Sequence, residues 1–194
     1  MFGDINEWAQ DSGWLHGPML AFASYGVVLF GVLLVVGFAV ARTRGPRTMA
    51  AALWAGVATL LAVAANQPIV NGVREARPYT DHPHILVLAN RSADFSFPSD
   101  HAVMAGAVAA GLWLVDRRLG IAATVAAALM AFARVYIAAH YPHDVVVGLA
   151  FGAAITLLGW WLLSRPLTRV VARLATTPLR PLLSGSTAAR AATL

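Results

Sequence analysis

The chain of 194 residues is 59% hydrophobic and only 12% charged, and its mean hydropathy is +0.67. A soluble domain usually carries about 25% charged residues, so this composition indicates one membrane domain and excludes an ordinary soluble protein. There is no cysteine, which excludes disulfide bonds and thiolate metal sites. The formal net charge is +5, but the basic residues are all arginines clustered beside apolar segments, a pattern typical of membrane topology and not of nucleic-acid binding.

The elements expected along the chain are helices. Residues 4–16 fit a short helix on the membrane surface, with Trp8 and Trp14 at the level of the lipid headgroups. A membrane span needs about 20 apolar residues. Five apolar segments follow, at residues 19–41, 49–70, 102–115, 119–139 and 145–163. The predicted fold is therefore all-α, a multi-pass transmembrane helical bundle of about five spans plus an N-terminal interfacial helix.

The arginine clusters predict how this bundle is oriented. They follow the first, third and fifth apolar segments, at Arg42, Arg44 and Arg47, at Arg117 and Arg118, and from Arg165 to Arg190. In a five-span protein these regions share one side, which the positive-inside rule makes cytoplasmic. We therefore expect a membrane-embedded domain at residues 1–166 and a basic cytoplasmic tail at residues 167–194, with the tail disordered beyond Pro178.

The opposite, extracytoplasmic side would carry the functional residues. It holds all six histidines, the loop at residues 71–98 and the turn at residues 140–144. Loops longer than about 12–15 residues are usually functional or disordered, and this one is expected to form a partly ordered cap over a site. The site would then face outward from the cytoplasmic membrane, near its surface.

One cluster of ionisable residues interrupts the apolar sequence at Arg134, His140 and Asp144. Charge at membrane depth is costly, so such groups usually serve a function. Asp144 lies one helical turn after His140, so its carboxylate can reach one imidazole nitrogen and leave the other free to attack. Arginine binds phosphate at two points through its planar guanidinium group. The cluster therefore predicts phosphoryl transfer through a phosphohistidine at His140.

Two further clusters lie upstream, at Arg77-Pro78 and at Ser99-Asp100-His101. Arg77 is the second candidate for binding phosphate. Ser99 and Asp100 look like residues at the start of a helix, whose free N–H groups would favour an anion, and Ser99 can also donate its hydroxyl. His101 is the candidate general acid that protonates the leaving oxygen.

These three clusters resemble the three signature motifs of the type 2 phosphatidic acid phosphatase superfamily, over roughly residues 66–152. The second motif, Pro-Ser-Gly-His, has Asp100 in the place of glycine, and the third has Ala133 in the place of serine. The first motif places a lysine seven residues before Arg77, where this chain has Val70. Arg74 could replace the missing cation and contact the distal or bridging phosphate. The alternative is a surface pair of Arg74 with Glu75 or Asp81.

Where the chain departs from these motifs, its sequence is similar to the bacitracin-resistance type of undecaprenyl pyrophosphate phosphatase. The shared features are Ser96-Phe97 before the Ser-Asp-His sequence and Tyr141-Pro142 after His140. This resemblance implies a membrane helical bundle without metal or other cofactor, whose substrate is a lipid diphosphate in the bilayer. It implies hydrolysis of polyprenyl diphosphate to the monophosphate, which recycles the lipid carrier of cell-wall (peptidoglycan) synthesis.

Other functions remain open from the sequence. A phosphatase of phosphatidate or phosphatidylglycerophosphate would use the same chemistry, and so would a phosphotransferase. A non-enzymatic lipid-phosphate transporter would bind phosphate without cleaving it, but the repeats and broken helices of transporters are not apparent. His82, His84 and His143 could join in a metal site, and they are interpreted instead as loop histidines, with His143 at the surface or supporting the site.

Overall fold

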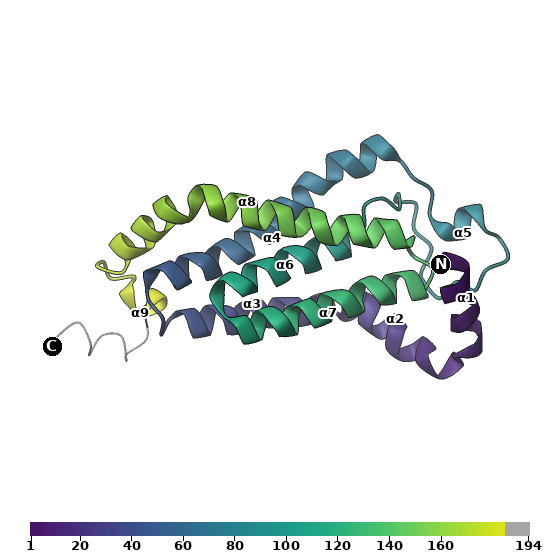
Figure 1. Cartoon of the computed structure of the whole chain (residues 1–194), viewed down its shortest axis with the longest axis horizontal. Helices are drawn as coiled ribbons and strands as arrows, with labels where there is room; N and C mark the ends of the chain where they lie inside the picture. The colour runs from purple at the N-terminus through teal and green to yellow at the C-terminus, as the bar shows by residue number, and fades with distance from the viewer. Residues whose placement is uncertain (185–194) are drawn as a thin grey trace.

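A computed structural model of the chain describes residues 1–184, and every regular element in that part is a helix (Figure 1). The predicted all-α fold is therefore confirmed. The elements in chain order are α1 (Phe2–Asp11), the 3-10 helix η1 (Gly13–Leu15), α2 (His16–Tyr25), α3 (Val27–Ala41), α4 (Pro46–Val73), α5 (Pro78–Asp81), α6 (Asp100–Val115), α7 (Arg117–Tyr136), α8 (Pro142–Leu174) and α9 (Arg180–Leu183).

The five predicted apolar segments are helical over most of their length, but they are not five equal spans. Three helices of the described chain are long and apolar enough to cross a membrane, namely those that begin at Pro46, Arg117 and Pro142. A fourth span exists if η1–α2 and α3, which meet at an angle of 54°, cross together. The remaining segment is α6, whose 16 residues cover about 24 Å and fall short of a bilayer's hydrocarbon thickness of about 30 Å.

The short helix α6 is the centre of the bundle, packed against α4, α7 and α8 (Figure 1). Its contact with α8 is close because glycine faces backbone on both helices. A Cβ at Gly106 would collide with the Leu149 carbonyl, and one at Gly152 would collide with the Val103 carbonyl. Small residues at such crossings let transmembrane helices approach each other. This packing holds the start of α6 against the first turns of α8.

The N-terminal helix packs on the end of the bundle where α7 finishes. The Trp8 ring lies 5.5 Å from the Tyr136 ring, and the Ser12 hydroxyl is 2.9 Å from the Tyr136 hydroxyl. The Asn6 side chain donates to the Leu86 carbonyl and accepts from the Leu86 N–H, at 2.7 and 3.0 Å. The predicted N-terminal helix is thus present as α1, and it also braces the segment at residues 82–99.

The predicted domain boundary at residue 166 falls inside α8, which continues through Pro166 to Leu174. The division at 166 therefore stays a prediction without a matching break in the helix. A short helix, α9, follows beyond Pro178, where disorder was expected. The rest of the predicted tail, residues 185–194, lies outside the described residues.

Candidate active site

The turn between α7 and α8 brings His140 back over the last turn of α7. The Arg134 carbonyl accepts hydrogen bonds from the N–H groups of both Ala139 and His140, at 3.1 and 3.3 Å. Ala138 adopts a left-handed backbone conformation, with φ 60°, and its side chain is fully buried. Larger residues would be strained there and would also lack room. The turn therefore places the His140 imidazole beside the Arg134 side chain, as the motif spacing predicted.

The two ring nitrogens of His140 have opposite surroundings. Nδ1 lies 2.8 Å from the Ser96 carbonyl oxygen and 3.4 Å from Asp144 Oδ2. A carbonyl oxygen can only accept, so Nδ1 carries the hydrogen. Nε2 lies 3.2 Å from Arg134 Nη2 and 3.4 Å from Arg77 Nη1, which can only donate. Both sides select the same tautomer, in which Nε2 presents its lone pair toward Arg77 and Arg134.

Asp144 was predicted to hold this tautomer, and its carboxylate lies near Nδ1 without being the nearest acceptor. Its Oδ2 accepts hydrogen bonds from the Ser96 hydroxyl and, at 2.8 Å, from the Tyr141 N–H. The nearer acceptor for His140 Nδ1 is the Ser96 carbonyl, so Ser96 contacts both members of the pair. The His140 ring is only 3% exposed. Burial lowers the pKa of His140 from its ordinary 6.5 to about 4; the nearby Arg134 and Arg77 also lower it, against the opposing hydrogen bond to Asp144.

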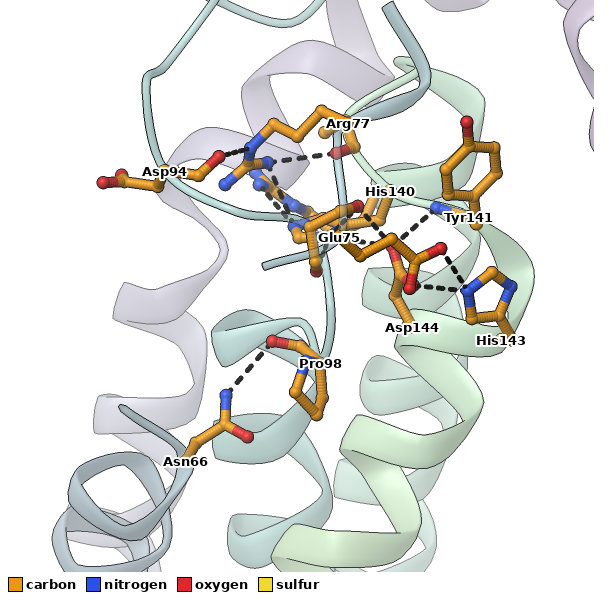
Figure 2. Close-up of polar contacts among 12 residues, drawn as sticks. Asn66, Glu75, Arg77, Asp94, Pro98, His140, Tyr141, His143 and Asp144 are labelled. Atoms are coloured by element: carbon orange, nitrogen blue, oxygen red, sulfur yellow. Dashed lines mark hydrogen bonds and ion pairs between the residues drawn. The ribbon is translucent and has the colours of Figure 1, made fainter. Parts of the chain in front are cut away.

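The two arginines at the site are held by backbone carbonyls. Arg77 donates from Nε to the Asp94 carbonyl at 2.9 Å and from Nη1 to the Ala139 carbonyl at 3.0 Å (Figure 2). Arg134 donates to the Ala23 carbonyl at 3.4 Å. Within residues 1–184 neither guanidinium forms an ion pair with a carboxylate. Arg77 is therefore oriented by two carbonyls and Arg134 by one long contact, and both charges stay available to an anion.

The start of α6 supplies the third cluster. Ser99 precedes the helix as its N-cap, and its fully buried hydroxyl has no hydrogen-bond partner within residues 1–184. Asp100 accepts hydrogen bonds from Asn66 at 2.8 Å and from Gln67 at 3.0 Å. Asn66 also donates to the Pro98 carbonyl at 3.1 Å, which ties α4 to the loop before α6 (Figure 2). The arrangement leaves His101 at the wall of the cavity described next.

A polar cavity of about 570 Å³ joins these groups. Its wall includes side chains from three sequence motifs, and the cap segment contributes residues 89–90 and 92–95. The predicted site residues in the wall are Arg77, Asp100, His101, Arg134 and His140. Asp144 lies behind His140, and Ser99 lies beside Asp144 through a 3.3 Å hydrogen bond from its N–H to the Asp144 carbonyl. The space suffices for a diphosphate headgroup next to Nε2.

Arg74 is the predicted site residue that lies apart. It ends α4 in a left-handed conformation, with φ 55° and ψ 37°, so it does not share a helix with Arg77. Its side chain is exposed, donates to the Asn71 carbonyl at 3.0 Å and is absent from the cavity wall. A contact with a distal phosphate is untested, and the alternative ion pair of Arg74 with Glu75 or Asp81 does not occur among the described residues.

One cluster among the described residues offers ligand atoms for a metal ion. Single atoms of Glu75, His143 and Asp144 lie within 4.8 Å of one another. His143 Nε2 is 2.8 Å from Glu75 Oε1 and 3.0 Å from Asp144 Oδ1. The 2.8 Å distance is a hydrogen bond between His143 and Glu75, and the 3.0 Å distance is a close contact between the imidazole and the Asp144 carboxylate.

The structure also adds residues that the motifs did not predict. Ser96 supplies the carbonyl next to His140 Nδ1, and Asn66 holds the turn before α6. Ser96 had a signal, because it precedes the second motif in the sequence that resembles the bacitracin-resistance type. Asn66 had only its polarity within an apolar segment, and Gln67 beside it shares that property.

The chain is similar in sequence to a family of known proteins. Residues 51–167 match the model of the PAP2 superfamily. Undecaprenyl-diphosphatase BcrC of Bacillus subtilis is 26% identical over 90% of this chain and 89% of its own length. Decaprenylphosphoryl-5-phosphoribose phosphatase of Mycobacterium tuberculosis is 38% identical over 57% of this chain and 60% of its own length. Lipid A 1-phosphatase of Rhizobium johnstonii is 34% identical over 54% of this chain and 46% of its own length.

No solved structure matches the chain. The family match covers more than half of the sequence and includes all three motifs, and the named relatives are phosphatases. The chain has helices long and apolar enough to cross a membrane, as its hydrophobic composition indicated, and the names of the relatives refer to lipid substrates. The chain therefore belongs to the PAP2 superfamily and is a membrane lipid phosphatase.

Proposed function

We propose that the protein hydrolyses a polyprenyl diphosphate of the undecaprenyl type to the monophosphate, and so recycles the lipid carrier of cell-wall synthesis. The observation that carries the chemistry is the position of His140 Nε2, an acceptor 3.2 and 3.4 Å from two guanidinium groups that lack carboxylate partners within residues 1–184. The similarity to undecaprenyl-diphosphatase BcrC over 90% of the chain supports the substrate.

The proposed reaction has two steps. His140 Nε2 attacks the terminal phosphorus while Arg77 and Arg134 hold the equatorial oxygens, where negative charge is spread in the transition state. The bond from phosphorus to the bridging oxygen breaks, and His101 protonates the leaving prenyl monophosphate. Water then attacks the phosphohistidine, gives a proton to His101 and releases phosphate. The N–H groups at the start of α6, next to Ser99 and Asp100, add positive potential for the anion.

We further propose that the site faces outward from the cytoplasmic membrane. The cavity lies at the end of the bundle that carries α1, α5 and the turn after α7 (Figure 1). The turns after α3 and α6, with Arg42, Arg44, Arg117 and Arg118, lie at the other end. The positive-inside rule supports a cytoplasmic location for that arginine-rich end.

A phosphomonoester on a lipid-linked sugar is a second candidate substrate. The cavity wall is rich in amides, from Gln67, Asn71 and Asn90, and it also includes the carboxylates of Asp94 and Asp100. Amides and carboxylates recognise hydroxyl groups well, whereas a carboxylate repels a second phosphate. The 38% identity to decaprenylphosphoryl-5-phosphoribose phosphatase points the same way.

The deciding experiment measures phosphate release by the purified protein from a panel of lipids. The panel holds undecaprenyl diphosphate, undecaprenyl monophosphate, a prenylphosphoryl sugar phosphate, phosphatidate and phosphatidylglycerophosphate. We expect the highest kcat/KM on undecaprenyl diphosphate, no loss with a chelator, and inhibition by vanadate, which mimics five-coordinate phosphorus. A higher kcat/KM on any other lipid would reassign the substrate. Activity lost on chelation and restored by a divalent ion would contradict the metal-free mechanism.

A further inference from the structure

The two oxygens of the Asp144 carboxylate face different partners. Oδ2 receives the hydrogen bonds from Ser96 and from the Tyr141 N–H, and it is the oxygen nearer to His140. Oδ1 is buried without a hydrogen bond of good geometry among the described residues, yet it lies 3.0 Å from His143 Nε2. The Asp144 side chain is fully buried, whereas the His143 side chain is 53% exposed. His143 thus connects this buried oxygen to the surface.

His143 is itself held in place from several directions. Its Nε2 lies 2.8 Å from Glu75 Oε1, in the segment after α4 (Figure 2). Its ring stacks on the Tyr141 ring at 5.5 Å and 9°, and the Phe97 ring lies 5.8 Å away. Carboxylate oxygens only accept, so Nε2 carries a hydrogen, which it donates to Glu75, while Asp144 Oδ1 lies in close electrostatic contact at 3.0 Å. An imidazole on a mobile surface side chain would not have these four neighbours.

The contact with Glu75 joins two parts of the site that come from distant segments. Glu75 belongs to the segment that leads to Arg77, and its carbonyl accepts a hydrogen bond from the Ser96 N–H at 2.8 Å. Ser96 provides the carbonyl that accepts from His140 Nδ1, while α8 provides Asp144. Glu75 and His143 therefore connect the two groups that face His140 Nδ1, which are the Ser96 carbonyl and the Asp144 carboxylate.

We propose that His143, held by Glu75, is a positioning residue of the phosphatase. It keeps Asp144 and the Ser96 carbonyl in register, and thereby directs His140 Nε2 at the phosphorus. The proposal rests on the proposed function, because it takes His140 as the nucleophile. His143 lines no part of the cavity, so its loss slows the chemical step and leaves the binding of the lipid largely unchanged.

The test compares kcat and KM of variants at His143 and Glu75 with those of a matched histidine. His84 is suitable, because it is an exposed histidine of the cap segment that also contains Glu75, and it makes no hydrogen bond or ion pair with the described residues. We expect His143→Ala to lower kcat about tenfold or more with KM changed by less than about twofold. His84→Ala should keep both constants. An unchanged kcat in His143→Ala, or a loss confined to KM, would overturn the proposal.

Conservative variants separate positioning from folding. The glutamine of His143→Gln can still donate toward Glu75 and Asp144, so it should recover most of the activity lost in His143→Ala. The asparagine of His143→Asn is equally polar but shorter, and it should recover less. This pair also decides the matter if His143→Ala fails to fold, because equal kcat values for Gln and Asn would refute the role. The double variant with Glu75→Ala and His143→Ala should have a kcat only slightly lower than that of His143→Ala alone, since the two residues act as a unit.

The same assays keep this proposal separate from the proposed function. Wild type and His140→Ala are measured beside the His143 variants on the same lipid. Turnover by His140→Ala would refute the phosphohistidine mechanism whatever His143 does. A wild type that depends on His140, together with a His143→Ala variant of full kcat, would refute the role of His143 alone.

Discussion

Both ends of the helical bundle carry arginines, but the partners of these side chains differ. At the arginine-rich end, Arg44 lies 2.7 Å from the Asp116 carboxylate, and the Arg47 guanidinium lies 5.9 Å from the centre of the Trp160 ring. At the end with the cavity, Arg77 and Arg134 are held by carbonyl oxygens and point at His140. A carboxylate neutralises an arginine, whereas a carbonyl only orients it. The difference separates Arg44, whose charge is neutralised by Asp116, from Arg77 and Arg134, whose charges are available to phosphate.

The largest effect is expected at the histidine between the two arginines. His140→Ala removes the nucleophile, so turnover should fall by at least about a thousandfold while the variant stays folded. The measurement is phosphate release by the purified variant, with the elution profile in detergent as the control for folding. Wild type quenched in alkali during turnover should retain a phosphoryl group that acid removes, as a phosphohistidine does. A folded His140→Ala variant with normal turnover would eliminate the mechanism.

The two ends should also differ completely in accessibility from outside the cell. The native chain has no cysteine, so one introduced thiol reports one position. His84→Cys, in the cap, should label with a membrane-impermeant thiol reagent in intact cells, and Arg44→Cys should not. Both should label after the membrane is permeabilised. The reverse pattern in intact cells would place the cavity in the cytoplasm and remove the proposed role in carrier recycling.

Removing one arginine from each end tests the comparison directly. Arg134→Ala should lower kcat/KM about a hundredfold or more, because a charge that stabilises the transition state is lost. Arg134→Lys should restore part of it, since lysine keeps the charge but not the two-point geometry. Arg44→Ala should change kcat/KM less than about twofold, because this ion pair lies at the other end of the bundle and a partly exposed pair contributes little. Comparable losses at the two ends would mean that their arginines do not differ in function.

The buried histidine should also affect stability as the pH falls. The pKa of His140 is lowered to about 4 in the folded protein, chiefly by burial, from its ordinary 6.5. Between these values the unfolded chain binds a proton that the folded chain does not, so stability falls as the pH drops from about 6.5 toward 4. His140→Gln lacks this proton, so its Tm in detergent should fall less than that of wild type over this interval. Parallel Tm curves would contradict the lowered pKa.

Hydropathy predicted the helices well, because every apolar segment had to satisfy its backbone hydrogen bonds internally. It did not predict the bend of 54° before α3 or the passage of α8 through Pro166. A proline usually ends a helix in water, but within a membrane bundle neighbouring groups can compensate for the lost hydrogen bond. The boundary of a helix there depends on packing, which the local sequence does not contain.

In the site, too, the local sequence predicted some features and not others. The motif spacing correctly predicted that Arg134 and His140 would meet, because a helix end and a short turn connect them. It could not predict the Ser96 carbonyl, since every residue has a carbonyl and its direction depends on the loop. Arg74 and Arg77 would share a face only if one helix contained both. Arg74 itself adopts the left-handed conformation that ends α4, so the helix does not reach Arg77.

The smallest effect is expected at Arg74, where charge and backbone can be tested separately. Its side chain is exposed and lies outside the cavity wall, so Arg74→Ala should change kcat/KM by less than about twofold on a diphosphate and on a monophosphate lipid. Arg74→Gly removes the same charge but fits the φ of 55°, so it should be more stable than Arg74→Ala by about 0.5–1 kcal/mol. If both variants instead lose activity only on the diphosphate, the lost charge is the cause, and Arg74 contacts the distal phosphate. If only Arg74→Ala loses activity, and equally on both lipids, the cause is the strained end of α4, which displaces the segment that carries Arg77.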